Sequence, residues 1–261
     1  MRIIALESRR AREMEELMRR SGLDAFVAPS VREVAIEENS EALAFGAGLA
    51  AGKYEAVICL TGVGVRQLAA ILKEQFGTMR DVVTIARGPK PAKALRELGV
   101  EPTEVAPDPA TYRELLAIVA ARRERSVAVQ EYGRPDQRLL EGLGELGSTD
   151  TQVPVYVWAL PEDTRPLEEA VRRIAAGEAD VIVFTASVQW EHLHEIARRL
   201  GVELSPRLRA MKIASIGPTM TETIRAAGYE PWLEASPPKL GILIRELALK
   251  ISQEPATETD G

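Results

Sequence analysis

The sequence has little of the material from which covalent and metal-based sites are built. Its 261 residues include one cysteine, Cys59, and two histidines. A single cysteine excludes an intrachain disulfide framework, and its position in the apolar run AVICL predicts a buried strand residue rather than a nucleophile. His192 and His194 are two positions apart, so they face different sides of a helix and we expect no shared metal site.

Long hydrophobic runs are also missing. The N-terminal run in MRIIALESRR is too short for a secretory signal, and no segment approaches the roughly 20 apolar residues of a membrane span. The net charge of −6 argues against nucleic acid as a partner. We therefore expect a cytoplasmic protein that binds neither membrane nor nucleic acid, and we expect a monomer.

Common catalytic motifs are absent as well. Gly62-Val63-Gly64 lacks the third glycine of a dinucleotide fingerprint and the acidic residue at the proper distance, and no lysine follows at P-loop spacing. Ser187 lacks the glycines of a nucleophile elbow. These absences disfavour a nucleotide-dependent enzyme and a serine hydrolase.

The chain does contain a repeated strand–turn–helix unit. An apolar run over 211–216 leads into Gly217-Pro218, and proline is well suited to the first position of the helix that we expect to end at Gly228. The segment 86–102 repeats this pattern at a shift of 129, which aligns Gly88, Pro89, Arg96, Gly99 and Pro102 with Gly217, Pro218, Arg225, Gly228 and Pro231. At a shift of 124, Glu7, Arg10 and Thr61 align with Glu131, Arg134 and Thr185. The sequence therefore indicates an internal duplication.

Each copy alternates short apolar strands with helices, which is typical of an α/β fold with a doubly wound parallel sheet. Strands are expected at 3–6, 25–28, 57–60, 82–85, 103–105, 181–184 and 211–216, and from residue 127. The segment 153–160 is expected to be extended. Helices are expected at 66–75, 112–123, 137–146, 168–176 and 240–250, and after both Gly-Pro pairs.

The two copies occur in permuted order, which predicts two domains with unequal connectivity. The first is discontinuous and comprises 1–35 plus 163–261, and the second is inserted and spans 38–158. Two extended hinge linkers, 31–37 and 153–162, would join them, and 252–261 would form a disordered polar tail. A simpler division near Arg125 would split both repeats.

Polar loops follow the predicted strands, at the sheet edge where open α/β folds bind ligands. They supply hydroxyls, backbone amides and cations suited to carboxylates or phosphates, although each loop is also an ordinary strand-to-helix turn. The candidate binding residues are Arg9, Thr61, Gly62, Val63, Gly88, Pro89, Lys90, Arg134, Thr185, Ala186, Ser187, Gly217, Pro218 and Thr219. Tyr156 is a lone phenol in an apolar hinge segment, where it either packs or donates a proton.

The sequence resembles the uroporphyrinogen-III synthase family over nearly its whole length. The residues that carry the resemblance are Arg9, Thr61-Gly62, Tyr156, Phe184-Thr185-Ala186-Ser187 and Ala214-Ser215-Ile216-Gly217-Pro218-Thr219. The resemblance implies two flavodoxin-like domains joined by a two-stranded linker. One residue departs from the pattern: Met220 stands where the family often has a second hydroxyl or a small residue. In the other copy, Lys90 occupies the place of Thr219.

The resemblance also implies a reaction. The expected enzyme is a cyclising hydro-lyase of tetrapyrrole and heme biosynthesis that uses no cofactor and no metal. Its substrate would be hydroxymethylbilane, a linear tetrapyrrole polycarboxylate. The substrate loses water, its last pyrrole ring attacks through a spiro intermediate, and uroporphyrinogen III forms with ring D inverted. By this resemblance Tyr156 would assist departure of the hydroxyl.

Two other functions are compatible with a two-domain α/β chain. One is a non-catalytic two-domain protein that binds a small polyanionic ligand, which would bind without turnover. The other is a two-domain nucleotide-sugar transferase, which the short chain and the absence of a diphosphate-binding signature disfavour.

Overall fold

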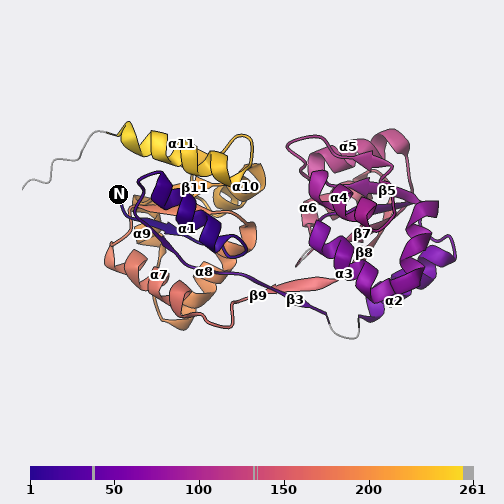
Figure 1. Ribbon diagram of the computed structural model, residues 1–261, viewed down its shortest axis with the longest axis horizontal. Helices are drawn as coiled ribbons and strands as arrows, with labels where there is room; N and C mark the ends of the chain where they lie inside the picture. Colours follow the sequence, from indigo (N-terminus) through magenta and orange to yellow (C-terminus); the bar gives the residue numbers. More distant parts are fainter. Residues whose placement is uncertain (37–38, 132, 134, 255–261) are drawn as a thin grey trace, which may run out of the picture. The chain divides into compact units, whose positions relative to one another are not determined.

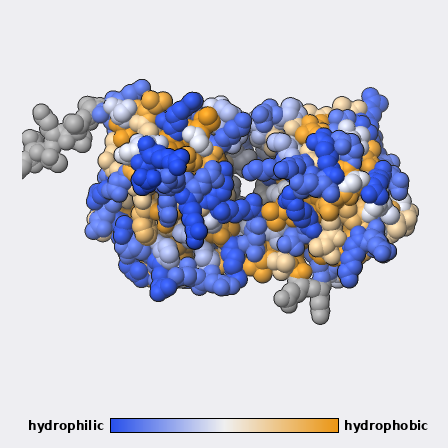
Figure 2. All heavy atoms as spheres, viewed as in Figure 1, coloured by the Kyte–Doolittle hydropathy of each residue, from blue (hydrophilic) through white to orange (hydrophobic). Residues whose placement is uncertain are grey.

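The computed structural model describes residues 1–36, 39–131, 133 and 135–254 (Figure 1). The chain divides into two compact units: unit 1 contains Met1–Arg32 and Leu160–Gly261, and unit 2 contains Glu33–Ala159. Within the described ranges, no helix is both long and apolar enough to cross a membrane. The face shown in Figure 2 carries mainly hydrophilic residues on both units, with hydrophobic ones interspersed.

Unit 1 is built on a parallel sheet of five strands in the order β12-β11-β10-β1-β2. The strands are β1 (Ile3–Ala5), β2 (Ala25–Val27), β10 (Val181–Phe184), β11 (Lys212–Ser215) and β12 (Leu233–Glu234). The helices are α1 (Ala11–Arg20), α7 (Arg165–Ala176), α8 (Ser187–Arg199), α9 (Ser205–Ala210), α10 (Pro218–Ala226) and α11 (Leu240–Ser252). Because apolar side chains of α1 and α11 pack on one face and those of α7 to α10 on the other, the central strands are buried on both sides.

Unit 2 repeats this architecture, with the strand order β6-β5-β4-β7-β8. The strands are β4 (Ala56–Cys59), β5 (Val83–Ala86), β6 (Glu104–Val105), β7 (Ser126–Gln130) and β8 (Thr149–Val153). The helices are α2 (Ser40–Ala50), α3 (Gly62–Leu72), α4 (Pro89–Glu97), α5 (Tyr112–Arg122) and α6 (Gln137–Glu145), with a 3₁₀ segment, η1 (Lys73–Asp81). α5 and α6 cover one face, and α2, α3, α4 and η1 cover the other.

Two short strands form the linker. β3 (Arg32–Ala35) and β9 (Tyr156–Ala159) pair as an antiparallel two-stranded sheet. β9 is also held by unit 2, because Val157 forms a parallel bridge with Gly133. A Cβ atom at Gly133 would overlap the Trp158 ring, so this close approach requires glycine.

The structure confirms the predicted fold class and the duplication. The two sheets have the same order once β12, β11, β10, β1 and β2 are matched with β6, β5, β4, β7 and β8. α10 and α4 both have nine residues, begin with proline and follow a glycine N-cap. The aligned arginines also have equivalent partners, since Arg96 bonds Glu101 and Arg225 bonds Glu230. In unit 1 the chain enters unit 2 after its second strand, β2.

Three predicted boundaries were wrong. α3 begins at Gly62 rather than at residue 66, because Thr61 caps it, and α7 begins at Arg165 because Pro166 fits its first turn. The segment 153–160 is not one extended piece, since Val153 ends β8 in the sheet and β9 starts at Tyr156. The polar sequence TDTQ of β8 gave no apolar signal for an edge strand.

Two further expectations met mixed outcomes. Cys59 is fully buried in β4, as predicted, and burial raises the pKa of its thiol to about 12. The tail was expected from residue 252, but Ser252 ends α11 and Glu254 pairs with Lys212. The rest of that tail, residues 37–38 of the first linker and Arg134 lie outside the described residues.

Candidate functional site

Each sheet has one place where its strand order reverses direction. In unit 1 it lies between β1 and β10, and in unit 2 between β4 and β7. Open α/β sheets bind ligands just beyond the carboxyl ends of the two strands at such a point. The chain leaves these strands at 6–10 and 185–186 in unit 1, and at 60–61 and after Gln130 in unit 2. Both pairs contain residues that the sequence singled out.

In unit 2, Thr61 is the centre of a hydrogen-bonded turn. It is the N-cap of α3, and its Oγ1 accepts a hydrogen bond from the backbone N–H of Gly64 at 2.9 Å. Its own N–H donates to the Oε1 of Gln130 at 3.3 Å. The Thr61 hydroxyl lies 3.3 Å from the hydroxyl of Tyr156. Thr61 is half-buried.

The structure places Tyr156 inside unit 2. Its side chain is 2% exposed and packs among the residues on the α2–α3–α4 face of the sheet. Among the candidate residues, Thr61 lies within hydrogen-bond distance of the phenol. Tyr156 therefore lies next to Thr61 at the unit 2 switch point.

A second predicted loop meets the Thr61 turn. The position of a Cβ atom on Gly62 would be 2.9 Å from the backbone oxygen of Lys90, so only glycine allows the first turns of α3 and α4 to approach this closely. Gly88 caps α4 at a φ of +110°, and Pro89 and Lys90 are exposed at its start. Because Pro89 and Pro91 lack an N–H, this helix start offers fewer backbone donors than the sequence analysis assumed.

Glu131 is a buried carboxyl that the sequence analysis aligned with Glu7 but did not place in the site. It is 3% exposed and follows β7, and within the part of the chain that the structure describes its Oε1 has no hydrogen-bond partner. Burial, together with the nearby carboxylates of Asp150 and Asp136, raises the pKa of Glu131 to about 7. Continuing the register of β4 and β7 by one residue sets Leu60 beside it, an apolar neighbour.

The corresponding turn of unit 1 is also closed by a glutamine, but from another element. The Oε1 of Gln189, on α8, accepts the N–H groups of Thr185 at 2.6 Å and Ala186 at 3.1 Å. Its Nε2 donates to the carbonyl of Leu6 at 2.7 Å. The Thr185 hydroxyl donates to Glu7 at 2.6 Å, so this threonine is already engaged by a carboxylate.

This geometry corrects the alignment between the repeats. Thr61 and Ala186 are the N-caps of α3 and α8, so the structural counterpart of Thr61 is Ala186 and the shift is 125, not 124. Thr185 corresponds to Leu60. Between β1 and β7 the shift remains 124. Val181 and Ala56 are counterparts at the shift of 125, and they pair with Ile3 and Val127, which are 124 positions apart.

Two further candidates of unit 1, Ser187 and Thr219, both contact Thr223 on α10. Thr223 Oγ1 donates to Ser187 Oγ at 3.0 Å and lies 3.1 Å from the carbonyl oxygen of Thr219. Thr219 is exposed at the start of α10, and Gly217 is buried against Pro238. Met220 is 2% exposed in the core, so it presents no side chain at this surface.

The other predicted residues take up simpler positions. Arg9 is exposed in the turn after β1, Pro218 and Ala186 are half-buried in first turns, and Val63 packs partly against the core. The sequence analysis missed Gln130, Gln189 and Thr223. A buried glutamine at a strand end or a helix start has no pattern of its own, whereas the alignment of Glu7 with Glu131 could have pointed to both carboxyls.

The histidines do not form a metal site. His192 is 7% exposed, with Nδ1 2.6 Å from the carbonyl oxygen of Ser30, whereas the His194 ring stacks on Trp190. Across the described residues, no group of three or more His, Cys, Asp or Glu side chains is arranged to hold a metal ion.

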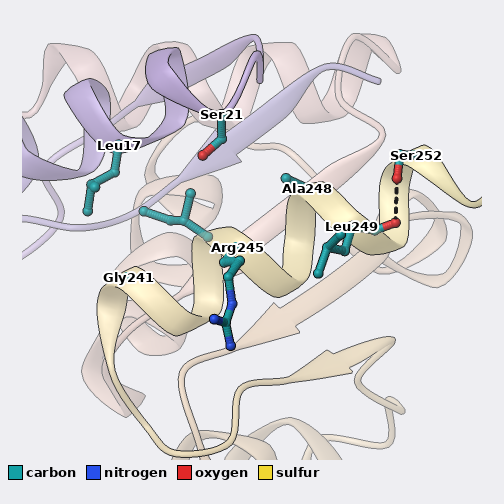
Figure 3. A pocket seen from close by; sticks show the side chains of 8 residues that line it. Leu17, Ser21, Gly241, Arg245, Ala248, Leu249 and Ser252 are labelled. Carbon is teal, nitrogen blue, oxygen red and sulfur yellow. Dashed lines mark hydrogen bonds between the residues drawn. The ribbon is translucent and has the colours of Figure 1, made fainter.

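A groove of 380 Å³ lies between α1 and α11 (Figure 3). Leu17, Ile244 and Leu249 supply its apolar lining, and Figure 3 shows the Ser252 hydroxyl turned to the carbonyl of Leu249, at 2.8 Å. None of the lining residues belongs to the loops at the switch points. The groove is therefore separate from the candidate site.

Comparisons with known proteins agree with this architecture. A family model described as "Uroporphyrinogen-III synthase HemD" matches residues 12–245. The "Putative uroporphyrinogen-III synthase" of Methanothermobacter thermautotrophicus is 29% identical over 224 residues, which cover 84% of this chain and 86% of that protein. "Uncharacterized protein YjjA" of Bacillus subtilis is 28% identical over 207 residues, which cover 75% and 76%.

Among solved structures, a mutant uroporphyrinogen III synthase from the extremely thermophilic bacterium Thermus thermophilus is similar in fold. Its TM-score is 0.75 at 23% identity, and the match covers 97% of this chain and 100% of that chain. At this identity the likeness concerns the fold.

Proposed function

The chain belongs to the uroporphyrinogen-III synthase HemD family, and on that premise we propose that it converts hydroxymethylbilane to uroporphyrinogen III. The reaction is a cyclisation with loss of water. The terminal hydroxymethyl group of the linear tetrapyrrole loses its hydroxyl, ring D attacks through a spiro intermediate, and the macrocycle closes with ring D inverted. The protein acts as a hydro-lyase, without a cofactor or metal.

The observation that carries this proposal is the match of the family model over residues 12–245, which includes both strands of the unit 2 switch point and strand β10 of the unit 1 switch point. The chemistry of those loops supports it. Hydroxyls, glycine turns, helix N-termini and cations suit a ligand with many carboxylates. We assign carboxylate binding to Arg9, Thr61, Gly62, Val63, Gly88, Pro89, Lys90, Arg134, Thr185, Ala186, Ser187, Gly217, Pro218 and Thr219.

Orientation would supply most of the catalytic effect. Closure without inversion is the easier route once the hydroxyl has left, so the protein must hold the ends of a flexible chain in the geometry that favours the spiro route. Each unit has its own set of such loops at the carboxyl ends of its strands.

Tyr156 has the acid role in this proposal. A hydroxyl leaves far more readily as water, and this requires a proton. The Tyr156 phenol is 3.3 Å from the Thr61 hydroxyl, which is the more exposed of the two groups. We assign Thr61 the contact with the leaving group and Tyr156 the supply of the proton through it. The proton released when the pyrrole ring regains aromaticity balances the one consumed.

Isomer analysis tests the function. The protein is mixed with hydroxymethylbilane without added metal or cofactor, and the oxidised products are separated by chromatography. We expect the type III isomer to form faster than the spontaneous reaction forms type I.

A non-catalytic binding protein for polyanions would give a different result. Type I would remain the dominant product, or its formation would be slowed by sequestration of the bilane. Either result with folded protein in stoichiometric excess would overturn the proposed function.

A further inference from the structure

Gln130 is a fully buried polar side chain at the carboxyl end of β7. Burial of an amide is unfavourable unless its hydrogen bonds are made. Both ends of this side chain are engaged: Oε1 accepts the N–H of Thr61 at 3.3 Å, and Nε2 donates to the backbone oxygen of Glu131. Gln130 thus connects the loop after β4 with the loop after β7.

The structure makes room for this side chain at Gly64. A Cβ atom on Gly64 would overlap the amide of Gln130. Gly64 is the third residue of α3, the position from which a Glu or Gln side chain usually bonds back to the N–H of the N-cap residue. Unit 2 lacks a side chain there, and Gln130 provides the missing acceptor from the neighbouring strand.

Unit 1 shows the ordinary arrangement. Gln189, the counterpart of Gly64, occupies the third position of α8 and accepts the N–H of the N-cap Ala186. Leu6 occupies the strand position that corresponds to Gln130, by the register of β1 and β10. The glutamine that accepts the N-cap N–H therefore lies on the helix in unit 1 and on the strand in unit 2.

We propose that Gln130 is a positioning residue that holds the Thr61 hydroxyl against the Tyr156 phenol. By fixing the Thr61 backbone from the strand side, Gln130 sets where the N-cap hydroxyl points. That hydroxyl accepts the N–H of Gly64 on one side and contacts Tyr156 on the other. Gln130 itself is buried away from solvent and acts on the phenol through Thr61. The inference rests on the proposed function, in which Thr61 and Tyr156 deliver the proton.

Two glutamine variants separate positioning from general packing. Gln130→Met and Gln189→Met each replace a buried glutamine by a side chain of similar length that makes no hydrogen bonds. Both glutamines accept the N–H of an N-cap residue, but Gln189 also bonds Thr185 and Leu6, so we expect Gln189→Met to lower Tm at least as much as Gln130→Met. The Tyr156 hydroxyl lies 3.3 Å from that of Thr61, the residue that Gln130 bonds, whereas Gln189 lies in the other unit. Only Gln130→Met is therefore expected to affect Tyr156.

The readout is the Tyr156 phenol itself. The full-length protein carries tyrosine labelled with ¹³C at ring Cζ, and Tyr156→Phe identifies the Tyr156 signal. We expect Gln130→Met to shift this signal and Gln189→Met to leave it in place. In the isomer assay, Gln130→Met is expected to lower kcat about 10-fold with a much smaller change in KM, as for a misplaced catalytic group.

A rescue variant completes the test. Gly64→Gln combined with Gln130→Leu transplants the unit 1 arrangement and creates the sequence Thr-x-x-Gln of a capping box. We expect the Tyr156 signal and kcat to return most of the way to the parent values. An unshifted Tyr156 signal in Gln130→Met, or an equal shift in Gln189→Met, overturns the proposal.

The two proposals fail in distinguishable ways. The NMR measurement needs no substrate, so absence of turnover in the parent protein contradicts the proposed function alone. Turnover that is unaffected by Gln130→Met, with a shifted phenol signal, contradicts the positioning role in catalysis while leaving the function intact.

Discussion

At both switch points the N–H of the helix N-cap residue needs a hydrogen-bond acceptor, and the two units supply it from different elements. In unit 1 the acceptor for the N-cap N–H is Gln189 on the helix, and in unit 2 it is Gln130 on the strand. The fold fixes which backbone groups need a partner, because a buried N–H without one is costly. It does not fix which element supplies that partner. The duplicated copies could therefore diverge here without losing the turn.

The exchange changes what the neighbouring hydroxyls can do. The Thr185 hydroxyl donates its proton in a hydrogen bond to Glu7, within unit 1. Thr61 faces the Tyr156 phenol instead of a carboxylate. At the position of Thr185, unit 2 has Leu60, which has no hydroxyl to offer Glu131, and among the described residues Oε1 of Glu131 has no partner. One threonine hydroxyl is thus bonded to a carboxylate, and the other lies beside a phenol.

The largest expected difference between the units concerns independent folding. We predict that a fragment of residues 38–158 folds alone, because the sheet of unit 2 and both of its apolar clusters lie within Glu33–Ala159. A fragment of residues 1–125 lacks β7 and β8 of unit 2 and β10 to β12 of unit 1, so neither sheet is complete. Thermal unfolding and amide NMR spectra of both fragments check this.

The result expected is one cooperative transition with dispersed amide signals for 38–158 and neither for 1–125. The reverse outcome would show that the units are divided differently along the chain. A fragment of residues 163–261 is a matched control, because it lacks β1 and β2, which complete the sheet of unit 1 beside β10, and is expected to remain unfolded.

The next prediction compares the acid with a binding residue. Tyr156→Phe should lower turnover about 10-fold to 100-fold, the range for loss of one general acid that water partly replaces. Because only a buried hydroxyl is removed, the free energy of unfolding should change little. Thr219→Val in unit 1 should instead raise KM more than it lowers kcat, since Thr219 is assigned to substrate binding.

Steady-state kinetics with product isomer analysis distinguishes these variants. Tyr54→Phe is the control, because Tyr54 is another buried tyrosine of unit 2 and packs on Phe45. Full turnover by Tyr156→Phe with type III as sole product would assign Tyr156 to packing.

The sequence predicted the fold better than it predicted the site. Apolar strands such as VIVF and AVIC and the two Gly-Pro turns are local signals, and together they defined two parallel sheets in permuted order. β8 was missed as a separate strand because an edge strand with the sequence TDTQV resembles a polar loop. Helix α3 was begun four residues too late because its first turn, Gly-Val-Gly, has low helix propensity and is held by the cap at Thr61.

The site residues that were missed act through long-range contacts. Gln130 and Thr61 are separated by 69 positions, and Gln189 reaches Leu6 across 183. No spacing rule connects such residues before the strands are paired. The one-residue error in aligning Thr61 with Thr185 has the same origin, because only the strand register shows that the repeats change shift from 124 to 125.

The smallest expected effect is a pH dependence that belongs to unit 2 alone. Burial raises the pKa of Glu131 from an ordinary value of 4.5 to about 7. The folded protein therefore holds this proton more tightly than the unfolded chain, so the contribution of Glu131 to stability falls as pH rises from about 4.5 to about 7 and stays low above it. Glu131→Gln removes the titration, and we expect it to stabilise the protein at pH 8 by about 1 kcal/mol, the lower end of the cost of an unsatisfied buried group.

Leu60→Thr tests the cause, because it gives Glu131 the hydroxyl that Thr185 gives Glu7. This variant loses apolar burial at every pH, so the informative quantity is the slope of stability against pH, not its absolute value. Chemical denaturation between pH 4.5 and 8 should give the steepest decline for the parent protein, a shallower one for Leu60→Thr and the shallowest for Glu131→Gln. Parallel curves for all three proteins would mean that the decline does not come from Glu131 and the residue beside it on the neighbouring strand.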